Sequence, residues 1–348
     1  METLIIGQGV AGSFLAWELI KRKQKIRIID NFHQQSSSLT AAGIINPVTG
    51  KRLALMPDFD MFYSCAKEVY RDLEGHFNRK FFKEVPILRI FKNEEERAKY
   101  NKKDERGILK KYLEEYFPAH THQPFLDDPL GSIRILNAAV VATELLLNSF
   151  KEFFLESNLL ARQAFVYNDL TVHDDHVKYQ GQSFKNIIFC EGFKAQFNPW
   201  FDWLPFNSVK GEILELKMTS DGLPDAIINK GKWCVPLEKD RWAAGASYLW
   251  EDLNCEPTKE GRDDILEELQ YIQREKTVVQ HKAAVRPVIK DQQPVIGMHP
   301  KMKNIGIFNG FGSKGFLIGP FYAKNFSAFL INKGPIISNV NIERFVHN

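Results

Sequence analysis

The first thirty residues alternate apolar runs with polar breaks in the order strand, turn, helix, strand. Residues 4–6 form a short apolar run that is typical of a buried parallel strand. Across residues 10–22 the apolar positions recur at roughly helical spacing, and residues 25–30 form a second strand pattern that ends in an acid. The pattern therefore predicts a βαβ unit within residues 1–45, of the kind that opens an α/β fold.

The remaining chain mixes helical and strand patterns. Residues 46–134 are rich in charged and aromatic residues, whereas the C-terminal part returns to an apolar strand, a second glycine-rich turn and a helix. The expected helices are 59–77, 94–117, 136–155 (capped by Asn137), 261–274 and 320–331, and the expected strands are 164–167, 170–172, 177–179, 185–192, 213–217, 242–246 and the run that begins at 305.

The turn after the first strand reads GQGVAG, residues 7–12. Gly7 permits a tight turn, Gly9 lets the backbone approach a pyrophosphate, and Gly12 lets the helix pack on the strand. The start of the helix adds N–H groups and a partial positive charge for phosphates. Asp30 lies 18 positions after Gly12 (30 − 12), close to the spacing at which an acid accepts hydrogen bonds from ribose hydroxyls.

This turn alone does not distinguish FAD from NAD, because both cofactors carry adenosine and pyrophosphate. Residues 36–45, SSSLTAAGII, are small and rich in hydroxyl groups, so their backbone is able to pass close to a flat cofactor. Residues 305–316, IGIFNGFGSKGF, again place a glycine turn before a helix. An NAD-dependent dehydrogenase explains residues 1–30 but gives no role to this second turn.

Five segments, in their order and spacing, resemble the FAD-dependent D-amino-acid oxidase superfamily, which includes glycine and sarcosine oxidases. They are IIGQGVAGS, SSSLTAAGI, NIIFCEG, RPVIKDQQPVIG and NGFGSKGF, and they extend over nearly the whole chain. The resemblance implies FAD and an α/β (α+β overall) architecture, with a Rossmann-like FAD-binding domain and a second, mixed-sheet substrate domain. We expect residues 1–45, 135–210 and 285–348 in the first domain and 46–134 and 211–284 in the second.

The same resemblance implies which residues hold the cofactor. The C-terminal turn would cradle the flavin from one side and residues 41–43 from the other, while the backbone of Val166 would meet adenine. The predicted cofactor-binding residues are Gly7, Gly9, Val10, Ala11, Gly12, Asp30, Ala41, Ala42, Gly43, Val166, Cys190, Gly192, Arg286, Gly310, Gly312, Ser313, Lys314, Gly315 and Phe316.

Two of these residues are also candidates for a catalytic role. Arg286 offers a planar, bidentate guanidinium to a substrate anion or to the flavin edge, or else ties loops together as a structural arginine. Lys314 would place positive charge near the flavin N1–C2=O region, or else is a solvated lysine. Lys51 and Arg52 follow a turn and would meet a carboxylate or phosphate, although a plain surface turn is the simpler interpretation. No acid–base triad is expected, because a flavin itself takes the hydride.

The C-terminal turn bears on the substrate. Residues 310–315, GFGSKG, are similar to the oxidase domain of the bifunctional enzymes that modify wobble uridine in tRNA. Glycine oxidases usually carry an arginine, which holds the substrate carboxylate, where this chain has Ser313. The resemblance implies oxidation of a C–N bond by hydride transfer to flavin N5, with two substrates left open: a small amine or amino acid, or a tRNA that carries a carboxymethylaminomethyl-uridine-like group.

Net charge and composition narrow the classes of binding partner and the cellular location that we expect for this protein. The chain has 348 residues and a net charge of +3, without the basic domain that is typical of nucleic-acid binders. Its four cysteines form no C-x-x-C pair, and no run approaches the ~18 apolar residues of a membrane span. We therefore expect reduced thiols, no membrane partner and a cytoplasmic location.

Two further groups of residues invite a functional interpretation. Residues 173–176, HDDH, look like metal ligands but lie between two strand patterns, so they predict a hairpin turn and no metal site. Several tryptophans would line a substrate pocket or, as we expect for most of them, the core. They are Trp200, Trp203, Trp233, Trp242 and Trp250.

Overall fold

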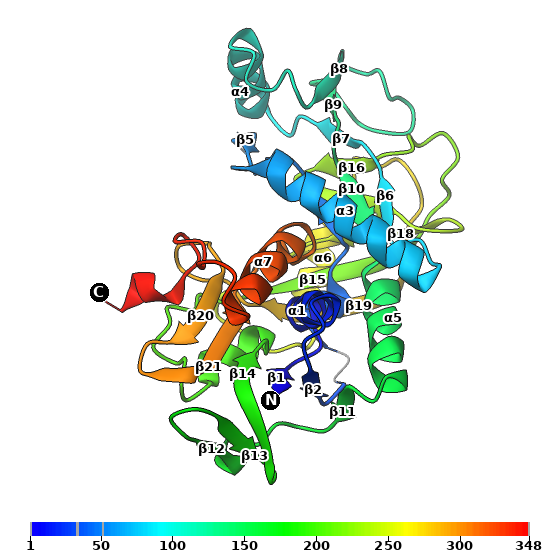
Figure 1. Ribbon diagram of the computed structural model, residues 1–348. Helices are drawn as coiled ribbons and strands as arrows, with labels where there is room; N and C mark the ends of the chain where they lie inside the picture. The colour runs from blue at the N-terminus through cyan, green and yellow to red at the C-terminus, as the bar shows by residue number, and fades with distance from the viewer. Residues whose placement is uncertain (1, 33–34, 51, 347–348) are drawn as a thin grey trace.

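The computed structural model describes residues 2–32, 35–50 and 52–346. Two large sheets dominate these residues, and the helix α1 lies near the centre of the molecule, between the sheets (Figure 1). The helices are α1 (Val10–Lys21), α2 (Ser37–Thr40), α3 (Phe59–Phe77), α4 (Glu94–Glu105), α5 (Thr143–Glu156), α6 (Lys259–Glu268) and α7 (Gly315–Leu330), with short 3-10 turns at Tyr167–Asp169, Gly192–Phe197 and Ile342–Phe345.

The first sheet has a parallel centre in the order β11-β2-β1-β14-β21, to which β20, β13 and β12 add antiparallel strands. The stretches Leu4–Ile6, Ile187–Phe189 and Ile305–Phe308 of its central strands are buried and nearly all apolar, as expected where helices cover both faces. The strands are β1 (Glu2–Ile6), β2 (Ile26–Asp30), β11 (Leu160–Arg162), β12 (Leu170–Val172), β13 (Val177–Tyr179), β14 (Gln182–Phe189), β20 (Val295–His299) and β21 (Met302–Asn309).

The second sheet is mixed and has the order β19-β15-β18-β17-β16-β7-β9-β8. Its strands are β7 (Ile87–Ile90), β8 (Leu113–Phe117), β9 (Ser132–Ile135), β15 (Val209–Lys217), β16 (Ile227–Lys230), β17 (Lys232–Pro236), β18 (Arg241–Gly245) and β19 (Thr277–Arg286). The smaller sheets are β3 (Ile44–Ile45) with β10 (Ala139–Val141) and β6 (Phe82–Glu84), and β4 (Val48–Thr49) with β5 (Ala54–Leu55). A Rossmann-like sheet beside a mixed sheet confirms the predicted fold class, while the exact domain boundaries stay a prediction.

Several expected elements are confirmed, and three are wrong. Residues 113–117 form β8 instead of continuing the helix, because their glutamates stand on a solvent-facing strand. Residues 164–167 form no strand, since the chain turns there into a 3-10 segment. Residues 136–142 contain β10, so α5 begins after Ala142 and Asn137 caps nothing; it adopts a positive φ of 55° before the strand.

The helix α7 begins five residues earlier than its proline suggests. Pro320 has no N–H, so it cannot donate to the carbonyl of Phe316 four residues before it. The hydroxyl of Tyr70, on α3, donates to that carbonyl at 2.7 Å. Tyr70 is fully buried, and the bond therefore both satisfies the freed carbonyl and fastens α3 to α7.

The tightest packing in the first sheet lies between α1 and the turn after β1. A Cβ on Gly12 would stand 1.9 Å from the carbonyl oxygen of Gly7, and one on Gly7 would stand 2.5 Å from the carbonyl oxygen of Cys190. Gly7 also has a φ of +102°, a backbone conformation that residues with a side chain rarely adopt. The absence of side chains therefore sets how closely the helix approaches the strand edge.

We expect Gly12→Ala to lower the free energy of unfolding by about 3 kcal/mol, because the new Cβ meets backbone that cannot move aside. Gly75→Ala is the matched control: Gly75 lies on the exposed face of α3 with nothing near its Cβ position. That change should raise stability by about 0.5–1 kcal/mol through helix propensity. Urea unfolding measures both, and equal effects of the two changes would contradict the packing argument.

Tyr70→Phe should cost about 1–3 kcal/mol, because it leaves the buried carbonyl of Phe316 without a donor. The same change in a Pro320→Ala background should cost less than half as much, since an alanine at position 320 restores a backbone N–H to the helix. Urea unfolding of the four proteins in this double-mutant cycle tests the coupling. An identical cost in both backgrounds would show that the tyrosine hydroxyl does not replace the missing bond.

Candidate active site

A cavity of about 1050 Å³ runs between the two large sheets. One end lies at the carboxyl ends of β1 and β2, where Gly7 and Asp30 line it, and the other reaches Trp233 and Arg89 on the mixed sheet. Ligands of open α/β sheets bind at such strand ends. The cavity thus joins a dinucleotide-binding edge to a second, chemically different surface.

At the first end, the start of α1 is open toward the cavity. No side chain caps this helix and its first turn carries no acid, so it favours an anion. The helix α2 limits the space at this helix start, because the hydroxyl of its Ser38 accepts a hydrogen bond from the N–H of Val10 at 3.1 Å. Ser38 would also be 3.1 Å from a Cβ on Gly9, so glycine keeps this passage wide enough for a phosphate chain.

The carboxylate of Asp30 is fixed at the end of β2. The backbone N–H groups of Gln8 and Phe32 donate to it at 2.8 and 2.6 Å. Gln8 is itself anchored, because its side-chain amide donates to the hydroxyl of Ser13 and to the carbonyl of Leu147. Asp30 therefore presents a rigid, oriented acceptor to the cavity, which suits the ribose hydroxyls of an adenosine.

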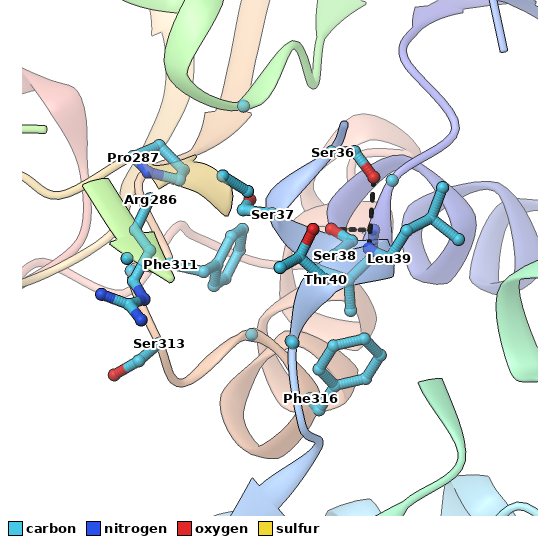
Figure 2. Close-up of a pocket in the computed structure, with 18 of the residues that line it drawn as sticks. Ser36, Ser37, Ser38, Leu39, Thr40, Arg286, Pro287, Phe311, Ser313 and Phe316 are labelled. Carbon is cyan, nitrogen blue, oxygen red and sulfur yellow. Dashed lines mark hydrogen bonds between the residues drawn. The ribbon is translucent and has the colours of Figure 1, made fainter. Parts of the chain in front are cut away.

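The middle of the cavity is lined by residues 41–43 and by the turn before α7. Figure 2 shows residues 36–40 on one side and Phe311, Ser313 and Arg286 on the other. Gly43 has a φ of +69° and a Cβ there would stand 2.1 Å from the carbonyl oxygen of Val141. Gly315 lets the start of α7 lie against Val10, because a Cβ on Gly315 would stand 2.9 Å from Cγ1 of Val10. Both glycines also line the cavity, and their missing side chains bring main chain to this slot, the part of the cavity that a flat ring would fill.

The predicted cofactor-binding residues all line this cavity except Gly12, Val166, Gly310 and Lys314. Gly12 acts through its packing on Gly7, and Gly310 adopts a φ of +79° at the end of β21. Val166 donates its N–H to the hydroxyl of Tyr179, while its neighbours face the cavity. Lys314 precedes α7 half-buried, and burial lowers the pKa of its ammonium.

Arg286, at the end of β19, lies flat between two partners. A Cβ on Gly211 would stand 2.1–2.4 Å from the guanidinium nitrogens and carbon, and the ring centroid of Tyr248 lies 4.8 Å from that carbon. Backbone hydrogen bonds between Lys210 and Leu249, at 2.8 and 3.0 Å, hold the tyrosine in place. Both the glycine and the tyrosine also line the cavity.

The guanidinium of Arg286 is buried but incompletely satisfied. Its Nη1 atom has no hydrogen-bond partner among the residues that the structure describes. Burial lowers the pKa of Arg286, yet an arginine remains charged at neutral pH. Arg286 also lines the cavity, and a buried cation with an unused donor there favours an anion, because an unpaired buried charge is costly.

The wall beside β14 carries a buried acid that sequence reasoning did not single out. Glu191 accepts hydrogen bonds from the hydroxyl of Tyr167 and the amide of Asn198, at 2.7 and 2.8 Å. Burial raises the pKa of Glu191, and the two hydrogen bonds offset part of that shift. Burial likewise raises the pKa of the neighbouring Cys190 thiol, which favours its neutral form at this wall.

A row of side chains crosses the mixed sheet and forms the floor of the cavity. Its members are Ile213, Gly245, Trp233, Asn229 and Arg89, each paired in register with the next across five neighbouring strands, and all of them line the cavity. Of the tryptophans, Trp233 belongs to this row, Trp242 is buried in the core and Trp250 is 59% exposed. Their spacing in the sequence gives no sign of the row, because it depends on strand order.

Comparison with known proteins identifies the family. The sequence profile of the family described as FAD dependent oxidoreductase (DAO) matches residues 2–328. The chain therefore belongs to the DAO family and is an FAD-dependent oxidoreductase.

Curated relatives are distant, and the bifunctional ones among them are longer. The tRNA 5-methylaminomethyl-2-thiouridine biosynthesis bifunctional protein MnmC of Acinetobacter baylyi is 22% identical over 98% of this chain and 55% of its own length. The glycine oxidase of Pseudomonas putida is 26% identical over 38% of each chain. The MnmC protein of Marinobacter nauticus is 27% identical over 41% of this chain and 25% of its own. The chain thus spans about half the length of these relatives, or less.

Solved structures share the fold. Glycine oxidase from Bacillus cereus superposes with a TM-score of 0.80 at 19% identity, covering 96% of each chain. Iminodiacetate oxidase from Chelativorans sp. BNC1 superposes with a TM-score of 0.78 at 20% identity, covering 97% of this chain and 98% of the other. At this identity the likeness concerns the architecture of the two sheets.

The cofactor of the family decides between the two dinucleotides in favour of FAD, and the residues present fit it. The open α1 start suits the pyrophosphate, Asp30 the ribose, and the backbone slot at Gly43 and Gly315 the flavin ring. Within the described residues no group of three or more His, Cys, Asp or Glu is placed to hold a metal, and residues 173–176 form the turn between β12 and β13. No helix in that part of the chain is long and apolar enough to cross a membrane.

Asp30→Asn should weaken FAD binding about tenfold, because a neutral amide accepts a weaker hydrogen bond than a carboxylate and offers one acceptor oxygen. The dissociation constant is measured by titrating apoprotein with FAD and following flavin fluorescence. Asp174→Asn is the control, since Asp174 stands exposed in the β12–β13 turn and should leave binding unchanged. Equal affinities of the wild type and Asp30→Asn would place the adenosine elsewhere.

Proposed function

We propose that this protein oxidises the C–N bond of an amine that carries a carboxylate, by hydride transfer to FAD. The observation that carries the proposal is the guanidinium of Arg286, which lines the cavity, lies against Gly211 and Tyr248 and keeps one donor unused. It lies beside Ser313 and Phe311 at the flavin end of the cavity (Figure 2). An acid bound there is held next to the redox-active ring.

The arrangement assigns to Arg286 the role that an arginine at position 313 would otherwise fill. Ser313 is exposed and short, so it cannot reach and neutralise a carboxylate as a guanidinium does. Arg286 approaches from the mixed sheet instead of from the α7 turn. Its guanidinium packs against Gly211 and the Tyr248 ring, and its N–H groups suit a bidentate pair with a carboxylate.

The protein needs few reacting side chains for this chemistry. FAD, when bound, would supply the hydride acceptor. The lone pair of the neutral amine would form the C=N bond as the hydride leaves, and the iminium would lose its N–H proton to water before water hydrolyses the imine. Arg286 would fix the acid and so orient the adjacent C–H. Trp233, Ile213 and Phe316 give that part of the cavity apolar walls, which favours a neutral amine over an ammonium.

A second substrate, a carboxymethylaminomethyl group on tRNA uridine, is supported by the GFGSKG turn and by the alignment with the Acinetobacter protein over 98% of this chain. That group also contains a secondary amine next to a carboxylate, so Arg286 would serve it equally. A net charge of +3 gives little of the phosphate attraction on which tRNA binding depends. The free amine is therefore the substrate that we favour.

Arg286→Lys should weaken the binding of a carboxylate ligand about tenfold, because the charge remains but the bidentate edge is lost, and Arg286→Leu should weaken it about 100-fold. Glycine and glycinamide are compared as ligands. The wild type should prefer the acid, and Arg286→Leu should lose that preference while its flavin spectrum stays unchanged. Arg262→Leu, on the exposed face of α6, is the control. A preference that survives in Arg286→Leu would make Arg286 purely structural.

The activity itself is tested by anaerobic reduction. Glycine, sarcosine, iminodiacetate and tRNA with carboxymethylaminomethyl-uridine are added separately to holoenzyme while the visible flavin band is recorded. Bleaching by a small amine supports the proposal. Bleaching by the modified tRNA alone would replace it with the second candidate, and bleaching by none of the four would refute both.

A further inference from the structure

The floor of the cavity extends well beyond Arg286, the residue proposed above to bind the acid of the substrate. From Ile213 the row passes Gly245, Trp233 and Asn229 to Arg89, crossing four strand spacings. At about 4.8 Å for each spacing the row is about 19 Å long. A simple amino acid fills only a small part of such a floor, so the outer part needs another explanation.

The chemistry of the floor changes along the row. Near Arg286 it is made of small or apolar residues, among them Gly211, Gly245 and Ile213. Trp233 follows as a broad aromatic surface. Beyond it Asn229 is half-buried, and its side-chain amide has no partner among the described residues. The floor is therefore small or apolar near Arg286, aromatic in the middle and polar at the outer end. This order suits a substrate whose extended chain ends in a polar group.

Most charges at the outer end neutralise one another. Arg89 and Glu96 form a buried ion pair, with the Nε of the arginine 2.8 Å from Oε1. Lys92 is paired with Glu268, and Lys99 with Glu95, each at 2.6 Å. In each of these pairs the positive and negative charges balance. The net charge at this end of the cavity is therefore set by other residues.

One cationic side chain at this end, that of Arg52, has no acidic partner among the described residues. Arg52 lines the cavity from the turn between β4 and β5, and it has no hydrogen bond or ion pair within the described part of the chain. The turn is held over the outer end of the floor, because the carbonyl of Gly50 accepts from Arg89 at 2.9 Å and that of Leu53 accepts from Lys103 at 2.6 Å. The adjacent Lys51 lies outside the described residues.

We propose a second anion subsite at the outer end of the cavity, formed by Arg52 and Asn229, for a terminal carboxylate on the far end of the substrate. The substrate is then an amine with two acids: one near the reacting carbon, on Arg286, and one at the end of an extended chain that crosses Trp233. This inference rests on the proposed function for the inner acid only. The outer subsite adds selection by length and by charge.

The test uses a series of N-carboxymethyl amines. N-carboxymethyl-β-alanine is the short probe, N-carboxymethyl-aminododecanoic acid is the long one, and N-carboxymethyl-dodecylamine has the long chain without the terminal acid. Dissociation constants are measured on holoenzyme by calorimetry, below the aggregation limit of the probes, and flavin reduction is followed in parallel. Arg52→Gln is compared with Lys102→Gln, an exposed lysine of α4 that does not line the cavity.

We expect the long diacid to bind about tenfold more tightly than the long amine without a terminal acid, because a charge-assisted hydrogen bond is added. Arg52→Gln should abolish that gain and leave the short probe unaffected, whereas Lys102→Gln should preserve it. Equal binding of the two long probes, or a gain that survives Arg52→Gln, would overturn the outer subsite. If the short probe still reduces the flavin, the proposed function stands in either case; if no probe does, the proposed function fails instead.

Discussion

Everything at the cofactor end depends on how closely α1 approaches the end of β1. A Cβ on Gly12 would stand 1.9 Å from the Gly7 carbonyl oxygen, so the helix reaches its position only because both residues lack side chains. That position directs the helix start at the phosphate passage and leaves room for Ser38 and for the start of α7 at Gly315. The same few ångströms would thus set the proposed pyrophosphate site and one wall of the proposed flavin slot.

The substrate end obeys a different constraint, that of a sheet whose strands pair across long stretches of sequence. Arg286 is oriented by a glycine on β15 and by a tyrosine that follows β18, and neither is its neighbour in the chain. The floor row likewise joins residues from Arg89 to Gly245 through strand pairing. A glycine at position 211 is required here for the same reason as at position 12: another group occupies the space of its side chain.

The sequence was informative where structure is local. Residues 7–12 and the acid at position 30 predict the first βαβ unit, because each glycine answers a backbone requirement within thirty residues. The helix over 59–77 was equally predictable from its apolar spacing. Residues 113–117 were not, since two adjacent glutamates on an exposed strand resemble the solvated face of a helix. The role of Gly211 and the row from Ile213 to Arg89 depend on strand order, which no local pattern contains. The start of α7 depends on a hydroxyl 246 positions away, from Tyr70.

The central claim is that the acid of the substrate binds Arg286 beside the flavin. A crystal structure of the holoenzyme with glycolate tests it most directly, because glycolate keeps the carboxylate and replaces the amine with a hydroxyl. We expect the carboxylate within hydrogen-bond distance of the Arg286 guanidinium, which should still lie against Gly211 and Tyr248. Glycolate bound elsewhere in the cavity, with Arg286 turned toward protein partners, would contradict it.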